Sequence, residues 1–117
     1  MKNGNLEQFL DTRWHMGAEL FYDKHVYWCE CVGNFDTGLL TFTLERWMAQ
    51  CDGELYTNIL TQDGQLADYQ IVFTTCDVDM DQIKKRFLEA PVFDGKTFWE
   101  VESDLIWVEN SGKSIQM

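Results

Sequence analysis

Residues 18–48 read AELFYDKHVYWCECVGNFDTGLLTFTLERWM, and this stretch decides the fold. The runs Ala18–Tyr22 and Val26–Val32 are rich in aromatic and β-branched residues, which is typical of strands. Residues 33–38 form a turn-rich loop containing Gly, Asn and Asp. Beyond it, Leu39–Met48 alternates apolar and polar side chains. The stretch therefore predicts three consecutive antiparallel strands.

The same pattern continues toward the C-terminus. Asp-Gly turns at 52–53 and 63–64 bracket a predicted strand over Glu54–Thr61, since Asp and Gly both tolerate positive φ. A further strand is predicted at Leu66–Thr75 and a last one at Thr97–Glu109. In Leu66–Thr75 the apolar positions alternate with polar ones: Ala67, Tyr69, Ile71 and Phe73. These segments together predict an antiparallel β-meander.

Two helices complete the predicted fold. The apolar spacing of residues 6–14 predicts an N-terminal helix that ends at Gly17. A second helix is expected at about 80–90, with Asp79 as its N-cap, Gln82 completing a capping box, Val78 packing on Ile83, and Pro91 stopping it. We expect an α+β fold in which both helices pack on the sheet, and residues 1–117 form a single domain.

The composition indicates a folded protein whose negative charge favours binding to a basic partner. Hydrophobic residues make up 45% of the chain, and the net charge is −11. Residues 1–50 carry a net charge of −3 and residues 51–117 a net charge of −8. A negative field repels nucleic acid and anionic membranes and attracts basic proteins. We therefore expect a basic protein partner, with no nucleic acid and no membrane; the oligomeric state stays open.

No motif of a known catalytic or metal site is present in the sequence. It lacks a P-loop, a dinucleotide-binding glycine pattern and a Gly-x-Ser-x-Gly elbow. His15 and His25 do not have zinc-site spacing, and the acidic residues from Asp77 onward lack the glycine and glutamate of a calcium loop. We expect a protein without cofactor or metal that is not an enzyme. The four cysteines, which are expected to be buried thiols, and the absence of an apolar leader predict a cytoplasmic protein: Cys29, Cys31, Cys51 and Cys76.

Two groups of residues are predicted to bind the partner. If Thr97–Glu109 is extended, Glu100, Glu102 and Asp104 project from one face about 6.7 Å apart. A row of like charges suggests a cationic partner. The second group places an aromatic residue beside the carboxylates of a hairpin, a combination that makes good interface anchors: Trp47, Asp52 and Glu54.

One segment resembles a known class of protein. The pattern Leu44-x-x-Trp47-x-x-x-Cys51-Asp52-Gly53, followed by the strand with Ile59, is similar to bacterial immunity proteins of polymorphic toxin and contact-dependent inhibition systems. Residues 62–64 read Gln-Asp-Gly where an Asn-Pro-Gly turn is expected in that family. The resemblance implies an antitoxin-type protein that neutralises a cognate toxin, often a basic nuclease.

Two other functions remain open. A phage protein that mimics nucleic acid, and so inhibits a restriction or CRISPR effector, also needs regularly spaced carboxylates; the row at residues 100–104 approximates the spacing of successive phosphates, roughly 6–7 Å. A small ligand-binding domain or enzyme instead predicts a closed apolar pocket containing His15 or His25.

Overall fold

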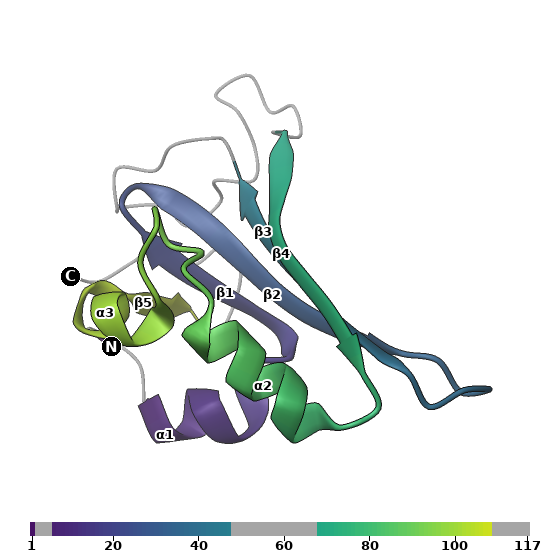
Figure 1. Cartoon of the computed structure of the whole chain (residues 1–117). Helices are drawn as coiled ribbons and strands as arrows, with labels where there is room; N and C mark the ends of the chain where they lie inside the picture. The colour runs from purple at the N-terminus through teal and green to yellow at the C-terminus, as the bar shows by residue number, and fades with distance from the viewer. Residues whose placement is uncertain (2–5, 48–67, 109–117) are drawn as a thin grey trace.

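The computed structural model describes residues 1, 6–47 and 68–108, and its core is a five-stranded antiparallel sheet in the order β4-β3-β2-β1-β5 (Figure 1). The predicted α+β class, the N-terminal helix and the helix at 80–90 are confirmed. The predicted strand Glu54–Thr61 lies outside the described residues. In chain order the elements are α1 (Leu6–Gln8), the π-helical turn η1 (Phe9–Arg13), β1 (Met16–Tyr22), β2 (His25–Gly33), β3 (Leu40–Trp47), β4 (Tyr69–Asp77), α2 (Met80–Glu89), α3 (Phe98–Val101), the 3₁₀ turn η2 (Glu102–Asp104) and β5 (Ile106–Val108).

Two irregularities in the strands set their register. Gly17, predicted to end the first helix, lies inside β1 with φ of +75°, at a register shift between Met16 and Ala18. A second shift in the pairing of β3 with β4 leaves Val72 without an opposite residue. Such bulges bend a strand and change which side chains face the core.

The start of α2 agrees with the sequence except in two details. Asp79 is the N-cap, and its side chain accepts a hydrogen bond from the Asp81 amide at 2.9 Å. The Asp79 amide donates to the Asp77 carboxylate at 2.9 Å and not to Gln82, so the predicted capping box does not form, and Val78 is 68% exposed instead of packing on Ile83. Arg86 joins α2 to β4, because its guanidinium pairs with Asp77 at 2.7 Å and donates to the Cys76 carbonyl.

The predicted strand Thr97–Glu109 is wrong over its first half. Residues 98–101 form α3 and residues 102–104 form η2, and the described strand in this segment is β5 at residues 106–108. The cause is a capping box: the Thr97 side chain accepts from the Glu100 amide, and the Glu100 side chain accepts from the Thr97 amide. Satisfying these amides locally favours a helical turn over a strand.

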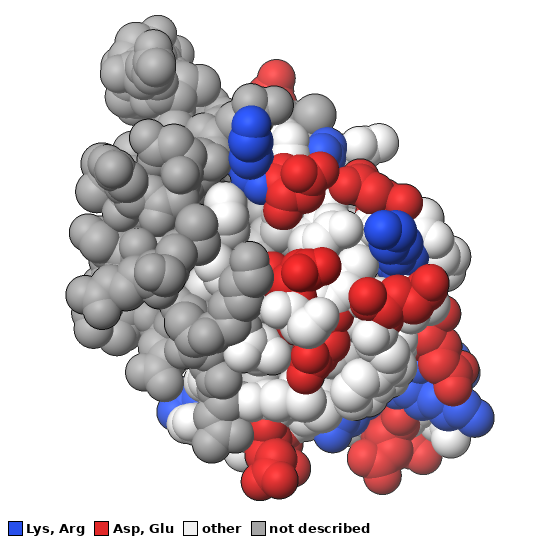
Figure 2. Space-filling model, turned by 90° about the vertical axis from the view of Figure 1, so that its left-hand side faces the viewer, with Lys and Arg blue, Asp and Glu red and all other residues white. Residues whose placement is uncertain are grey.

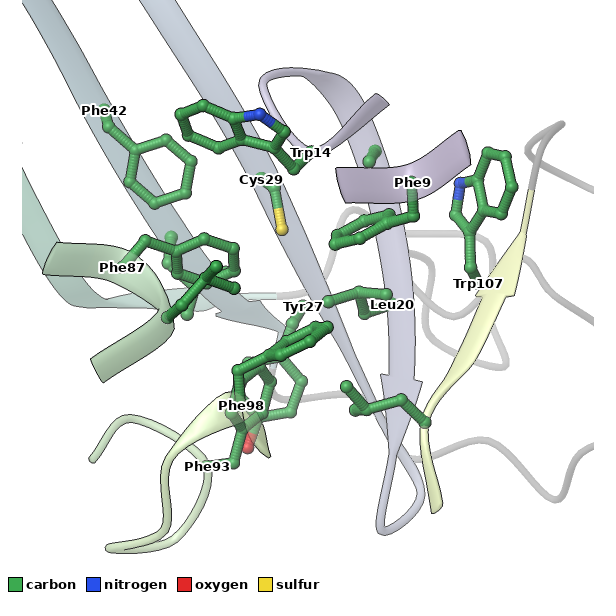
Figure 3. Packing of buried hydrophobic residues seen from close by; sticks show 14 of the residues in the cluster. Phe9, Trp14, Leu20, Tyr27, Cys29, Phe42, Phe87, Phe93, Phe98 and Trp107 are labelled. Carbon is green, nitrogen blue, oxygen red and sulfur yellow. The ribbon is translucent and has the colours of Figure 1, made fainter. Parts of the chain in front are cut away.

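The larger of the buried clusters lies between the helices and one face of the sheet (Figure 3). Phe87 of α2 packs against Phe42 of β3, with ring centroids 4.8 Å apart. Cys29 is fully buried there, and burial raises the pKa of its thiol. Cys31 is half-buried, whereas Cys76 is exposed, so the expectation of a buried thiol is wrong for Cys76; Cys51 lies outside the described residues.

Within residues 1, 6–47 and 68–108, none of the helices has the length and apolar character to cross a membrane.

Candidate protein-binding surface

The acidic row predicted at residues 100–104 does not form. Glu100 is part of the capping box of α3, and Glu102 lies 3.4 Å from the amino group of Met1. Asp104 is exposed in the turn that follows. Because the segment is helical, its carboxylates lack strand spacing, and the comparison with successive phosphates no longer applies. On the side of the molecule shown in Figure 2, acidic side chains are interspersed with uncharged and basic ones.

The second predicted group is only partly described. Trp47 ends β3, and its ring packs on Tyr69 of β4 with centroids 4.9 Å apart. His25 donates from Nδ1 to the Trp47 carbonyl at 2.9 Å. The indole Nε1 of Trp47 is buried and has no hydrogen-bond partner within the described part of the chain. Asp52 and Glu54 lie outside the described residues.

The sheet has two faces of different character. One is covered by α1, α2 and α3, as the core shows (Figure 1). Residues of the opposite face alternate with the core residues along β2 and β3, and the bulge at Val72 places the side chains of Tyr69 and Ile71, at the start of β4, on this face. We call its central part the outer face and define it by five residues: Trp28, Glu30, Glu45, Tyr69 and Ile71.

Strand register brings these residues together. Trp28 pairs with Glu45, and Glu45 pairs with Ile71, so three strands contribute one row across the sheet. Tyr69 lies in the next row opposite Trp47, and Glu30 lies on the other side of Trp28 along β2. Tyr69 and Ile71 are 50% and 55% exposed. The outer face therefore combines carboxylates with exposed apolar surface.

Gly17 positions the indole of Trp28. A Cβ atom on Gly17 would lie 3.1 Å from Cζ2 of Trp28, so the ring covers the backbone of β1 where no side chain projects. The Trp28 Nε1 then donates to the Glu30 carboxylate at 3.4 Å. The bulge in β1 thus creates space for an aromatic ring beside a carboxylate.

The carboxylates of the outer face have no basic partner among the described residues. The ion pairs recorded among the described residues involve other carboxylates: Met1 pairs with Glu102, and Arg86 pairs with Asp77. Partial burial, with a smaller contribution from Glu30, raises the pKa of Glu45. Arg46 follows Glu45 in sequence, but its Nε donates to the Tyr27 hydroxyl. Both effects on Glu45 disfavour its charged form, and an added cation would offset them.

The histidines are engaged in the fold. The His15 ring meets Trp14 edge-on with centroids 5.0 Å apart, and burial is the main cause that lowers its pKa. His25 is buried with its hydrogen bond to Trp47. Among the residues that the structure describes, no three His, Cys, Asp or Glu side chains are grouped as metal ligands would be. The arrangement on the outer face suits recognition of a macromolecule by charge and apolar contact.

Most of the outer face was not singled out from the sequence. The polar face of β3, with Glu45, is recognisable from the alternation in 39–48. Trp28 and Glu30 alternate with Cys29 and Cys31 in the same way. Their convergence with Ile71 depends on strand register and on the Val72 bulge, which alternation does not reveal.

No protein-family model matches this chain, and comparisons with curated proteins and with solved structures found no match.

Proposed function

We propose that this chain is a bacterial immunity-type protein, not an enzyme, that binds and neutralises a basic protein toxin through the outer face. The observation that carries the proposal is the pair Glu30 and Glu45, which lies beside apolar side chains without a basic partner in the described part of the chain. A partner's lysine or arginine would offset the partial burial and the smaller repulsion from Glu30 that together raise the pKa of Glu45.

The physical mechanism is complementarity. A nuclease binds phosphate with lysine and arginine side chains, and carboxylates can occupy the same positions with charge-assisted hydrogen bonds. The net charge of −11 would speed the encounter, and the desolvated apolar centre would slow dissociation. Trp28, Tyr69 and Ile71 supply that centre. In this proposal the encounter takes place in the cytoplasm of the producing cell.

The nucleic-acid-mimic alternative has lost its main observation, because residues 98–104 are helical. A mimic needs carboxylates at phosphate spacing along a surface, and the outer face offers two carboxylates among apolar residues. This composition favours a protein partner over imitation of a nucleic-acid backbone.

The test uses the genes on either side of the one that encodes this chain. Each neighbouring product is expressed alone and together with this chain, and growth and complex formation are measured. We expect one basic product to stop growth and the chain to restore it. Glu30→Gln with Glu45→Gln should weaken the purified complex by at least about 10-fold, because buried interfacial charge pairs contribute about 1.5 kcal/mol or more.

A matched control removes the same charge elsewhere. Glu7→Gln with Glu89→Gln changes two exposed carboxylates on the helical side and should leave affinity within about two-fold. The proposal is refuted if neither neighbouring product is toxic. It is also refuted if the Glu30→Gln, Glu45→Gln variant binds the neutralised toxin as tightly as the Glu7→Gln, Glu89→Gln control does.

A further inference from the structure

The hairpin tip, residues 34–39 between β2 and β3, projects away from the helices and from the rest of the sheet (Figure 1). Phe35 stands on it with 105% relative exposure, as open to solvent as in an extended chain. Val32 and Leu39 at its base are also exposed. A large aromatic side chain without any contact adds nothing to the packing of its own core.

Hydrogen bonds within the loop order the backbone that carries Phe35. The Asn34 carboxamide oxygen accepts from the amides of Asp36 at 2.9 Å and Thr37 at 3.3 Å. The Gly38 amide donates to the Asn34 carbonyl at 2.8 Å, and the Asn34 amide donates to the Leu39 carbonyl at 2.9 Å. A loop that is already ordered loses little conformational entropy on binding.

The hairpin tip is continuous with the outer face. Val32 pairs with Thr41, and Glu30 pairs with Thr43 one step back along the same two strands. All four side chains lie on the face that the helices leave uncovered. A partner seated on Glu30 therefore reaches the tip without crossing the helical layer.

The charge of this region restricts the partner. Glu30 and Asp36 are the only charged residues of 30–43, so the segment contains no base. Beside Phe35 is a shallow hollow of about 600 Å³ that Asp36 lines together with Val32 and Leu39. This lining suits a long basic side chain, whose methylene groups contact the apolar residues while its head meets the carboxylate.

We infer that the hairpin tip inserts into an apolar cleft with a basic rim on the partner protein, with Phe35 as the anchor and Asp36 meeting a rim lysine or arginine. The inference rests on the proposed function and adds to it the element that enters the toxin. An inserted aromatic anchor in a desolvated pocket is the typical centre of a tight interface.

Photocrosslinking separates this inference from the proposed function. The photoreactive residue p-benzoylphenylalanine is introduced in turn at Phe35, Ile71 and Trp99 in the host that encodes the chain. Trp99 is the control, because it is 53% exposed but lies on the helical side. We expect positions 35 and 71 to capture the same basic protein and position 99 not to capture it.

Each other outcome is decisive. Capture from position 71 without capture from 35 overturns the hairpin inference and leaves the proposed function standing. Capture from position 35 without capture from 71 overturns the outer face as the binding surface. Capture from neither position, or capture of a second copy of this chain, overturns both.

Titration with the captured protein gives the magnitude. Phe35→Ala should weaken binding by about 30-fold or more, whereas Phe35→Trp should remain within a few-fold. Val78→Ala, an exposed apolar control between β4 and α2, should not change binding. Since Phe35 makes no contact, circular dichroism should show unchanged folding in all variants. Binding of the free protein to phosphatidylcholine vesicles that is lost in Phe35→Ala would instead assign the tip to lipid and overturn the inference.

Discussion

Replacement of Gly17 with alanine tests how the outer face is built. Gly17 has φ of +75°, a conformation that costs an L residue about 1–2 kcal/mol. The new Cβ would also lie 3.1 Å from Cζ2 of Trp28, closer than the ordinary carbon contact of about 3.5–4.0 Å. The indole must therefore shift, and overpacking of this kind costs about 1 kcal/mol at the low end of its range, because the half-buried Trp28 can yield.

The expected loss for Gly17→Ala is the sum of the two effects, about 2–3 kcal/mol. At about 4 °C for each kcal/mol in a domain of this size, the unfolding midpoint should fall by about 8–12 °C. Gly38→Ala is a matched control, because Gly38 has φ of +74° but no atom within 4 Å of an added Cβ. It should lose only the backbone part, about 1–2 kcal/mol.

Urea unfolding followed by circular dichroism measures both variants, and a double-mutant cycle with Trp28→Ala isolates the contact. The loss caused by Gly17→Ala should shrink by about 1 kcal/mol in the Trp28→Ala background. Equal losses for Gly17→Ala and Gly38→Ala, together with no coupling to Trp28, would refute the claim that Gly17 makes room for the indole.

Three further predictions concern other parts of the chain. Thr97→Ala should lower the free energy of unfolding by about 1 kcal/mol in urea titrations, whereas Thr97→Ser, which keeps the capping oxygen, should lose much less. The raised pKa of Glu45 means that its contribution to stability is present below the pKa of the unfolded chain and is lost as pH rises through the folded value. Glu45→Gln should therefore unfold at higher urea concentration than the wild type at pH 7, and the difference between the two midpoints should be smaller at pH 4. Equal differences at the two pH values would contradict a raised pKa of Glu45. Brief iodoacetamide treatment with peptide mapping should label the exposed Cys76 and leave the buried Cys29 unmodified until the chain unfolds.

The elements predicted best are those fixed by short-range signals. Asp79 and Pro91 bound α2 in the sequence and in the structure, because a cap and a proline act on adjacent backbone. The dipeptide Asp94-Gly95 is a short-range signal of the same kind, and it forms a turn with positive φ at both residues. Alternation also assigned Leu44 to the core and Glu45 to the opposite face.

The incorrect strand prediction arises where the sequence fits both a strand pattern and a helix pattern. Residues 97–105 alternate like a strand, yet Phe98, Val101 and Leu105 also have the i, i+3, i+7 spacing of a helix, and all three are buried. The Thr97 and Glu100 capping box decides between the two patterns, and it is a signal that the sequence contains. Alternation alone predicts an extended chain and a row of carboxylates at residues 100–104, whereas the cap favours the helical turn that forms.

The outer face could be predicted only in part, because a bulge changes which face of the sheet a side chain occupies. Strict alternation places Ile71 and Phe73 on one face of β4. The extra residue Val72 separates them, so that Phe73 packs near Phe42 in the core while Ile71 lies opposite Glu45. A shift of one residue moves a strand's side chains to the other face, and neither of the residues flanking Val72 is a glycine that would mark the bulge.

The composition of the outer face is better explained by binding than by stability. Placing Glu45 in partly apolar surroundings near Glu30 destabilises its charged form, and a neutral residue opposite Trp28 and Ile71 would avoid this. The same surroundings strengthen the attraction of the Glu45 carboxylate for an incoming cation, since less water screens it. The hairpin tip follows the same logic, because exposing Phe35 on an ordered loop contributes nothing to the isolated fold but lowers the entropy lost on association. Because β2 and β3 carry both features, one basic partner that covers the outer face and receives Phe35 in a cleft would account for the unfavourable placement of each.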